Sequence, residues 1–174
     1  ASDVYKRQII PDGITKIGTH SFFACYPITY IHIPNSVKTI ELFAFASCTD
    51  LDTIILGNSV DSIEVAAFRI NDRLKTIYSM NPIPPAAHTG AFDSFNSFFI
   101  QCTLHVPVGS LQAYKNAEVW KNFKNIVEND FTGIERPSPN KAKIFGNKNS
   151  IAFRNIEPDT DISCLLYTSD AADE

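Results

Sequence analysis

The 174-residue sequence contains no apolar stretch of the length that a membrane-spanning helix requires. It also lacks a glycine-rich phosphate loop, a nucleophile elbow, a paired acid motif and any CxxC or Cys/His zinc spacing. We therefore expect no membrane insertion, no metal or other cofactor, and no enzymatic activity. The formal net charge of −4 leaves no basic field, so we expect no nucleic-acid partner.

Both ends of the chain look foreign to the rest. Residues 1–8 can be encoded by GCG TCA GAT GTG TAT AAG AGA CAG. The reverse complement, read one base in, encodes Cys-Leu-Leu-Tyr-Thr-Ser-Asp-Ala, the sequence of residues 164–171. This arrangement resembles a sequencing adapter inserted in opposite orientations, so we interpret 1–8 and 164–174 as adapter-derived; two unrelated native termini are the alternative. Because these segments carry +1 and −3, the remaining residues, 9–163, carry −2.

Three consecutive segments, 10–32, 33–55 and 56–78, carry the same apolar pattern at a spacing of 23 residues. The matched columns are Ile14/Val37/Val60, Ile17/Ile40/Ile63, Ser21/Ala44/Ala67, Phe22/Phe45/Phe68, Cys25/Cys48/Asn71, Ile28/Leu51/Leu74 and Ile31/Ile54/Ile77. A unit this short cannot bury its own apolar face, so it must stack on its neighbours and share a core with them. The pattern predicts a repeat solenoid, which favours a binding surface over a catalytic pocket.

Each unit is predicted to contain two extended segments and an arc. Residues 51–56 alternate apolar and polar, as a strand with one buried face should, and a second short extended segment covers residues 37–40. The arc is expected to be turn-rich or helical, with Ala44 and Phe45 facing inward. Cys25 and Cys48 share a column, so a disulfide is sterically conceivable. We favour small buried thiols, with Asn71 in their place in the next coil.

The period breaks after Tyr78. Residues 81–85 contain three prolines and can be neither helix nor central strand, whereas Ala91 and Phe92 restore the Ala-Phe step in a fourth, stretched coil. An open solenoid end needs a cap, and Ser110 can begin a helix that supplies one. Its apolar residues, which resume after a break, would be Leu111, Tyr114, Val119, Trp120, Phe123 and Ile126.

These observations divide the chain. We expect a solenoid with its C-terminal cap over residues 9–128 and a linker over 129–140, where Pro137 and Pro139 lie in a polar stretch. Residues 141–163 then read as a truncated C-terminal β segment, with a hairpin that turns at Gly146 and Asn147.

The second unit carries a recognisable motif. Residues 34–54 read PNSVKTIELFAFASCTDLDTI and resemble the BspA-like leucine-rich repeat, P-x-S-V-x-x-I-x-x-x-A-F-x-x-C-x-x-L-x-x-I. The units within residues 10–78 match it, with departures at Gly13, Ser21, Gly57, Arg69 and Asn71. The resemblance implies an α+β repeat solenoid, a leucine-rich-repeat-like right-handed coil stack with one β-strand face. A C-terminal helical cap and a partial β-hairpin tail would complete it, and residues 111–127 resemble the closing segment of surface repeat proteins from Bacteroides-type bacteria.

The outward positions of the main strands are the candidate binding surface. Strand alternation predicts this stripe as Tyr30, His32, Thr53, Ile55, Thr76, Tyr78 and His105. Tyrosine supplies a large, rigid contact area with a polar group, as binding surfaces prefer. The alternative is that these are ordinary strand-forming residues on a solvated sheet.

The histidines have a simpler interpretation than metal ligation or general base catalysis. His32 and His105 are expected two or three coils apart, with no Asp or Glu at a neighbouring outward strand position. We therefore interpret them as surface histidines. His20 and His88 are predicted to lie isolated in turns.

The family resemblance implies a non-catalytic, adhesin-like recognition module that is secreted or displayed at the cell surface. Its partners would be proteins of the host or of neighbouring cells, extracellular matrix, or glycans, and we expect a monomer. The alternatives are a structural spacer and an accessory region of a larger secreted enzyme.

Overall fold

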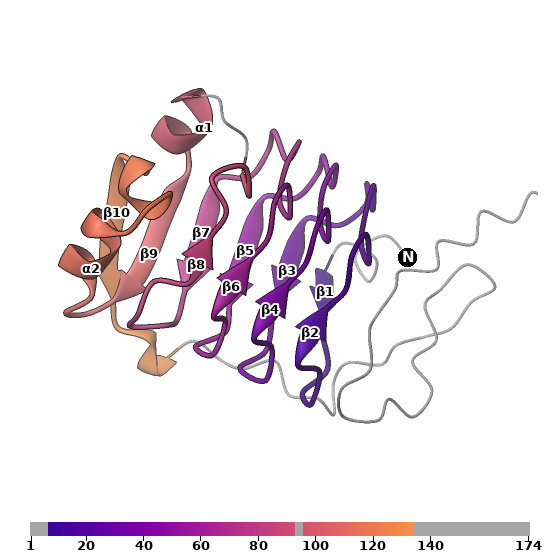
Figure 1. The fold of residues 1–174 in the computed structure, drawn as a ribbon. Helices are drawn as coiled ribbons and strands as arrows, with labels where there is room; N and C mark the ends of the chain where they lie inside the picture. Colours follow the sequence, from indigo (N-terminus) through magenta and orange to yellow (C-terminus); the bar gives the residue numbers. More distant parts are fainter. Residues whose placement is uncertain (1–6, 93–95, 134–174) are drawn as a thin grey trace, which may run out of the picture.

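A computed structural model describes residues 7–92 and 96–133. The chain winds through coils that stack side by side, and successive coils add strands to two parallel sheets (Figure 1). The core lies between these sheets and continues under the helices at the C-terminal side of the stack. The predicted repeat fold of parallel strands is confirmed.

Within the described residues, the larger sheet has six strands in the order β1-β3-β5-β7-β9-β10, and all neighbouring pairs are parallel. Its strands are β1 (Arg7–Ile9), β3 (Tyr30–His32), β5 (Thr53–Leu56), β7 (Thr76–Ser79), β9 (Thr103–Pro107) and β10 (Asn125–Asn129). Tyr30 pairs with Thr53, and Thr53 with Thr76, so each step across these strands advances the chain by the predicted 23 residues.

The smaller sheet consists of two-residue strands in the order β2-β4-β6-β8. These are β2 (Lys16–Ile17), β4 (Thr39–Ile40), β6 (Ser62–Ile63) and β8 (Ala86–Ala87). They confirm the second extended segment of each unit. The fourth coil keeps this strand although Pro85 immediately precedes it, because β8 lies at the edge of the sheet.

The arcs that follow β2, β4 and β6 are built from turns, whereas helix α1 (Asn96–Gln101) follows β8. Each of the first three arcs contains two residues with positive φ, four positions apart, in the columns His20/Phe43/Ala66 and Ala24/Ser47/Ile70. None of these six residues is glycine, although this left-handed region favours glycine. The bend therefore stores local strain that the stacked coils must outweigh.

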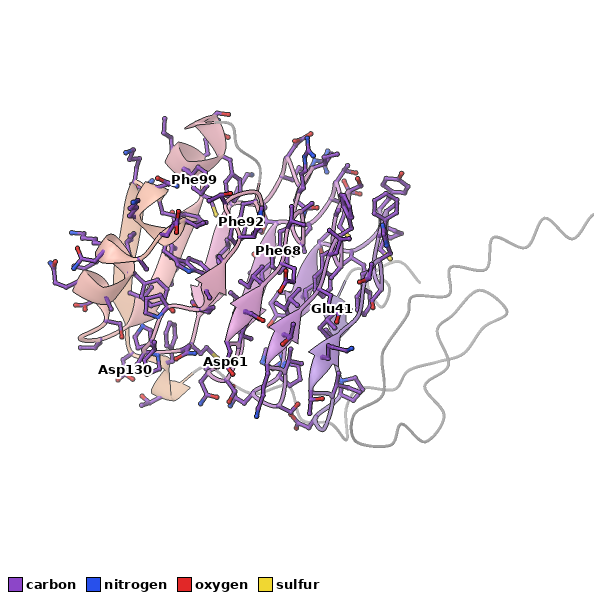
Figure 2. All side chains as sticks on the ribbon, in the orientation of Figure 1. Glu41, Asp61, Phe68, Phe92, Phe99 and Asp130 are labelled. Atoms are coloured by element: carbon purple, nitrogen blue, oxygen red, sulfur yellow. The ribbon has the colours of Figure 1, made fainter. Side chains whose placement is uncertain are left out.

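A ladder of phenylalanine rings runs through the core from coil to coil (Figure 2). Phe22, Phe45, Phe68 and Phe92 stack nearly parallel, with successive ring centroids 4.9, 5.3 and 5.5 Å apart. All four side chains are buried. The last spacing shows that the stretched fourth coil, although longer in sequence, returns its phenylalanine to the same column.

The cysteine column beside this ladder holds buried thiols at Cys25 and Cys48 that are not joined by a disulfide, as the preferred interpretation states. The Cys48 thiol donates to the carbonyl oxygen of Phe22 at 3.0 Å. The Asn71 amide donates to the equivalent carbonyl one coil later, that of Phe45, also at 3.0 Å. Asn71 thus replaces cysteine because both side chains can satisfy the same carbonyl of the preceding coil.

The C-terminal part of the described chain contains helical turns and one more strand. They are α1 (Asn96–Gln101), α2 (Leu111–Asn116), the 3₁₀ helices η1 (Trp120–Asn122) and η2 (Phe131–Gly133), and β10. Two expectations for this part are wrong. Ile126 belongs to strand β10 and not to a helix. Ser110 precedes α2, but its side chain makes no capping hydrogen bond.

A carboxylate from β10 takes the role predicted for Ser110. Glu128 Oε1 accepts hydrogen bonds from the backbone N–H groups of Gly109 and Leu111, at 2.8 and 3.1 Å. A carboxylate at the start of a helix accepts hydrogen bonds from N–H groups that have no partner within the helix, and its negative charge interacts favourably with the positive end of the helix dipole. The start of α2 is therefore tied to the last strand of the large sheet.

Aromatic side chains attach these helical turns to the last coil. Trp120 Nε1 donates to the Pro85 carbonyl at 2.7 Å, and the Tyr114 hydroxyl donates to the Asn81 carbonyl at 2.8 Å. The Trp120 ring meets Phe92 edge-on at 5.8 Å. The phenylalanine ladder thus continues into the C-terminal aromatic residues.

Several predicted segments lie outside the described residues. These are the hairpin over 141–163, most of the linker 129–140 and the segment 164–174. Arg7 and Gln8, assigned to the adapter, pair with Tyr30 and Ile31 through the main chain of β1. Main-chain pairing requires no particular side chain, so the adapter origin stays a prediction.

Candidate interaction surface

The outward side chains of the large sheet form two straight rows, because parallel strands in register place equivalent positions side by side. We call Tyr30, Thr53, Thr76 and Thr103 the threonine row, and His32, Ile55, Tyr78 and His105 the aromatic row. Every residue of the predicted stripe lies in one of these rows. The inward residues between them, Ile31, Ile54, Ile77 and Leu104, are all buried.

The two rows differ from a freely exposed stripe. Seven of their eight side chains are half-buried, and Ile55 is only 5% exposed. Ile55 lies between His32 and Tyr78 in the register, and these larger side chains flank it. A partner would therefore meet the edges of the flanking rings rather than Ile55 itself.

The C-terminal end of the aromatic row is held in place by further contacts. The Tyr78 and His105 rings stack at 4.5 Å with an interplanar angle of 18°, and His105 Nδ1 hydrogen-bonds Asn129 Oδ1. Phe131 of η2 approaches Tyr78 edge-on at 6.3 Å. These contacts fix the orientation of the Tyr78 and His105 rings.

Residues beside Phe131 stabilise the turn that carries it. The backbone N–H of Thr132 donates to Asp130 Oδ1 at 2.9 Å. This bond favours the charged carboxylate and lowers the pKa of Asp130. The turn thus places Phe131 against the sheet while Asp130 faces solvent.

A polar contact at the start of β5 orients Thr53 of the threonine row. The Thr53 hydroxyl donates to Asp52 Oδ1 at 2.7 Å. In the turns that precede strands β5 and β7, Asp50 and Arg73 of neighbouring coils form an ion pair at 2.8 Å, with side chains that are 43% and 70% exposed. This exposed pair adds little to stability, so its main effect is to mix positive and negative charge beside the rows.

The two histidines of the rows lie far from each other. His32 and His105 lie on β3 and β9, three strand positions apart, which corresponds to ~14 Å at the usual strand spacing. Two imidazoles at that separation cannot share a metal ion. Among the described residues, no group of three or more His, Cys, Asp or Glu side chains could hold a metal.

The strongest pKa shifts lie in the core, away from the rows. Burial, with a smaller contribution from the charge of Asp52, raises the pKa of Cys102 to about 12. Burial also raises the pKa of Tyr114 to about 12, against the opposing effect of its hydrogen bond with Ser79. Both groups are protonated at neutral pH and serve packing and hydrogen bonding.

Sequence reasoning missed five residues that extend the surface: Thr103, Asn125, Val127, Asn129 and Phe131. Thr103 could have been found, because the resemblance between residues 104–107 and 31–34 aligns it with Tyr30. Asn125 and Val127 continue the two rows on β10, and Val127 is 44% exposed. No repeat signal marks this strand, because its sequence follows an apolar pattern that reads as helix.

His20 is also placed differently from the prediction. It is not isolated in its turn, because its ring stacks on Phe43 at 5.2 Å and meets Phe23 edge-on at 5.4 Å. His88 accepts a hydrogen bond at Nδ1 from the backbone N–H of Gly90. The sequence signal for the first contact was available, since His20 and Phe43 are 23 residues apart.

The helices in the described ranges are too short or too polar to cross a lipid bilayer.

Comparison with protein families gives a match over residues 4–105 to "BspA type Leucine rich repeat region (6 copies)". This span is more than half of the chain. A search of curated proteins found no match. Two solved structures are similar: pneumococcal vaccine antigen PcpA, and a leucine-rich cell surface protein from Faecalibacterium prausnitzii A2-165.

The similarity to these structures is distant. PcpA is 12% identical with a TM-score of 0.40, and the match covers 72% of this chain and 42% of PcpA. The Faecalibacterium protein is 17% identical with a TM-score of 0.35, and the match covers 72% of this chain and 32% of that protein. The chain thus spans less than half the length of either protein.

Proposed function

Because this chain belongs to the BspA-type leucine-rich repeat family, we propose that it is a non-catalytic, adhesin-like module that binds a protein partner. The proposed contact surface consists of the threonine and aromatic rows on the large sheet. The observation that carries this proposal is the register, which brings all seven predicted stripe residues onto one face in two aligned rows. We further propose that the module acts as a monomer, either secreted or at a cell surface.

The chemistry of the rows favours a protein over other partners. Tyrosine and histidine rings offer rigid apolar area with a polar edge, and the threonine hydroxyls can both donate and accept hydrogen bonds. Tyrosine in particular is enriched among the residues that contribute most of the binding energy at the centres of protein interfaces. The stacked Tyr78 and His105 rings lose little rotamer freedom on binding, because contacts within the chain already order them.

We also propose that α2 and η1 close the C-terminal end of the repeat stack. Tyr114, Trp120 and Phe123 are buried where a further coil would otherwise stack. The hydrogen bonds to the Asn81 and Pro85 carbonyls support this interpretation, because they replace contacts that a next coil would supply. Such a cap would keep the core covered while the strand face stays accessible.

The proposal is tested with the full chain against a panel of purified extracellular-matrix and cell-surface proteins, by surface plasmon resonance. We expect at least one protein to bind, and Tyr30→Ala/Tyr78→Ala to weaken that binding by about tenfold or more, the effect of losing interface hot spots. Tyr26→Ala is the matched control, because Tyr26 is 56% exposed but lies outside the strands. It should bind like the parent.

Two results would contradict the proposal. Equal binding by the parent and the double variant would move the contact away from the strand rows. Absence of binding by the folded chain to every protein of the panel would favour the structural spacer, or an accessory role beside a catalytic domain.

A further inference from the structure

A second group of aromatic side chains lies away from the strand rows, on the arcs of the first two coils. We call His20, Phe23 and Phe43 the arc cluster. The His20 and Phe43 rings stack at 5.2 Å with an interplanar angle of 19°, and Phe23 meets His20 and Phe43 edge-on at 5.4 and 6.4 Å. Phe23 is 42% exposed, His20 is exposed and Phe43 is half-buried. The rings thus form one small platform open to solvent.

The fold does not require aromatic residues at these positions. The third coil carries Ala66 in the column of His20 and Phe43. In the column of Phe23, the second coil carries the buried Ala46 and the third the exposed Arg69. The core column of Phe22, Phe45 and Phe68 keeps its aromatic residue in all three coils, so the arc cluster is a local addition to the first two.

The backbone under the platform has a left-handed conformation at His20 and Phe43. His20 and Phe43 have φ values of 59° and 55°, in the left-handed region. This region is unfavourable for a residue with a Cβ atom and is readily adopted by glycine. Two rings are nevertheless held in this conformation with at least part of their surface in water. Ala66 has the same conformation in this column, so the coil geometry imposes it whichever side chain is present. The aromatic side chains are therefore a separate feature, and their exposed surface is available to a ligand.

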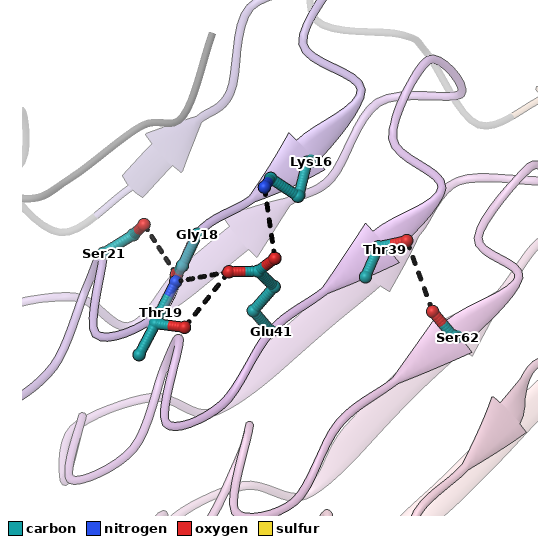
Figure 3. A network of polar contacts seen from close by, with 7 residues as sticks. All are labelled: Lys16, Gly18, Thr19, Ser21, Thr39, Glu41 and Ser62. Carbon is teal, nitrogen blue, oxygen red and sulfur yellow. Dashed lines mark hydrogen bonds and ion pairs between the residues drawn. The ribbon is translucent and has the colours of Figure 1, made fainter. Parts of the chain in front are cut away.

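Polar side chains close in sequence to the platform residues are held by contacts between neighbouring coils, and Figure 3 shows these contacts. Glu41 Oε2 accepts hydrogen bonds from the backbone N–H and the hydroxyl of Thr19, both at 3.1 Å, and Glu41 Oε1 pairs with Lys16 at 3.2 Å. Thr19 precedes His20, and Glu41 lies two residues before Phe43. The Thr19 oxygen can still accept a hydrogen bond, and a carboxylate has more acceptor sites than these contacts use.

We propose that the arc cluster and this polar group together bind a neutral saccharide. A pyranose ring has a face of C–H groups that packs on aromatic rings, whose negative faces attract the positive edge of a C–H bond. Its hydroxyl groups at the rim donate and accept hydrogen bonds, which matches Glu41, Thr19 and Lys16. A purely apolar partner would make no hydrogen bonds to these polar groups. Glu41 and Lys16 carry opposite charges and pair with each other, so they favour neither an anion nor a cation.

This site is distinct from the strand rows. The arcs follow the small sheet, whereas the rows lie on the outward face of the large sheet, in another part of each coil (Figure 1). One molecule could therefore hold a protein on one surface and a saccharide on the other.

The test uses the full chain and saturation-transfer difference NMR with chitotetraose, laminaritetraose, mannotetraose and N-acetyllactosamine as probes. We expect at least one probe to bind, and His20→Ala/Phe43→Ala to weaken its affinity about tenfold or more through the loss of two ring contacts. Alanine already occupies this column at Ala66, so the variant should fold, and its circular dichroism and melting curve check that.

Two controls locate the effect. Ile83→Ala removes an apolar side chain that is 73% exposed but outside the cluster, and should leave saccharide affinity unchanged. Tyr30→Ala/Tyr78→Ala alters only the strand rows and should also leave it unchanged. The proposal is overturned if none of the four saccharides binds, or if the folded His20→Ala/Phe43→Ala variant binds as tightly as the parent.

Discussion

Replacement of Gly57 by alanine tests how closely neighbouring coils approach. A Cβ atom at Gly57 would lie 2.5 Å from the carbonyl oxygen of Pro34, 2.6 Å from its carbonyl carbon and 2.8 Å from the backbone nitrogen of Asn35. Pro34 is the equivalent residue one coil earlier. All three atoms belong to the backbone, so no side chain can move aside and the coils themselves must shift.

The magnitude follows from two opposing effects. Overpacking of a close contact costs typically 1–3 kcal/mol. Alanine gains about 0.4–1 kcal/mol by reducing the freedom of the unfolded chain. We therefore expect Gly57→Ala to lower the free energy of unfolding by about 2 kcal/mol, since a contact below 3 Å places the cost at the upper end of its range.

Gly90→Ala is the matched control. A Cβ atom there would lie no closer than 3.6 Å to its nearest neighbours, side-chain atoms of His88 and Val65, which is ordinary contact. This variant should be as stable as the parent or slightly more stable. Urea unfolding followed by the fluorescence of Trp120 compares both. If Gly57→Ala and Gly90→Ala differ by less than about 0.5 kcal/mol, the coils do not approach as described.

Three further outcomes are expected. Ile70→Asn should raise the free energy of unfolding, measured in urea, by about 1 kcal/mol. Ile70 is 46% exposed with φ of 60°, a conformation that asparagine tolerates better than isoleucine. Ile83→Asn is the control and should give no such gain, because φ at Ile83 is not positive. Tyr114→Phe should lower stability by about 1–3 kcal/mol, because it leaves the buried Ser79 hydroxyl and the Asn81 carbonyl without their phenol partner; unchanged urea midpoints would contradict this. The free energy of unfolding should keep its full value below pH 9 and fall as the pH rises towards 12. Cys102 and Tyr114 have pKa values raised to about 12 in the folded chain, so the unfolded chain loses these protons first. Cys102→Ala should show a shallower fall, and a free energy of unfolding that does not change with pH in any variant would refute the assignment.

Much of the fold could be predicted because its signals recur at one offset. The Phe22, Phe45 and Phe68 column, the two strands per unit and the outward stripe each repeat with the 23-residue period. In each case the local pattern and the contact between coils agree, since a residue packs against its own counterpart one coil away.

The remaining features depend on contacts that no period encodes. Strand β10 forms because it pairs with β9, and Ile126 alone, three residues after Phe123, reads as helical. Glu128 reaches the start of α2 from 17 residues further along the chain, so a local capping rule points to Ser110 instead. The contact of Phe131 with Tyr78 lies beyond the last recognisable repeat.

Backbone conformation was equally hidden. The left-handed columns contain His, Phe, Ala, Ser and Ile, none of which marks positive φ as glycine would. The coil geometry imposes this conformation at each of these positions, whichever side chain is present. The arc cluster became visible only when His20 and Phe43 were found stacked.

The strand rows are the proposed binding surface, and a charge placed at their centre is the sharpest test of that proposal. Thr76 lies between Thr53 and Thr103 in the threonine row, whereas Thr39 is an equally half-buried strand threonine on the other sheet. The measurement is the affinity of Thr76→Arg and Thr39→Arg for the protein partner identified in the panel. If the proposal is right, Thr76→Arg abolishes binding and Thr39→Arg binds like the parent. Full binding by a folded Thr76→Arg variant would contradict it.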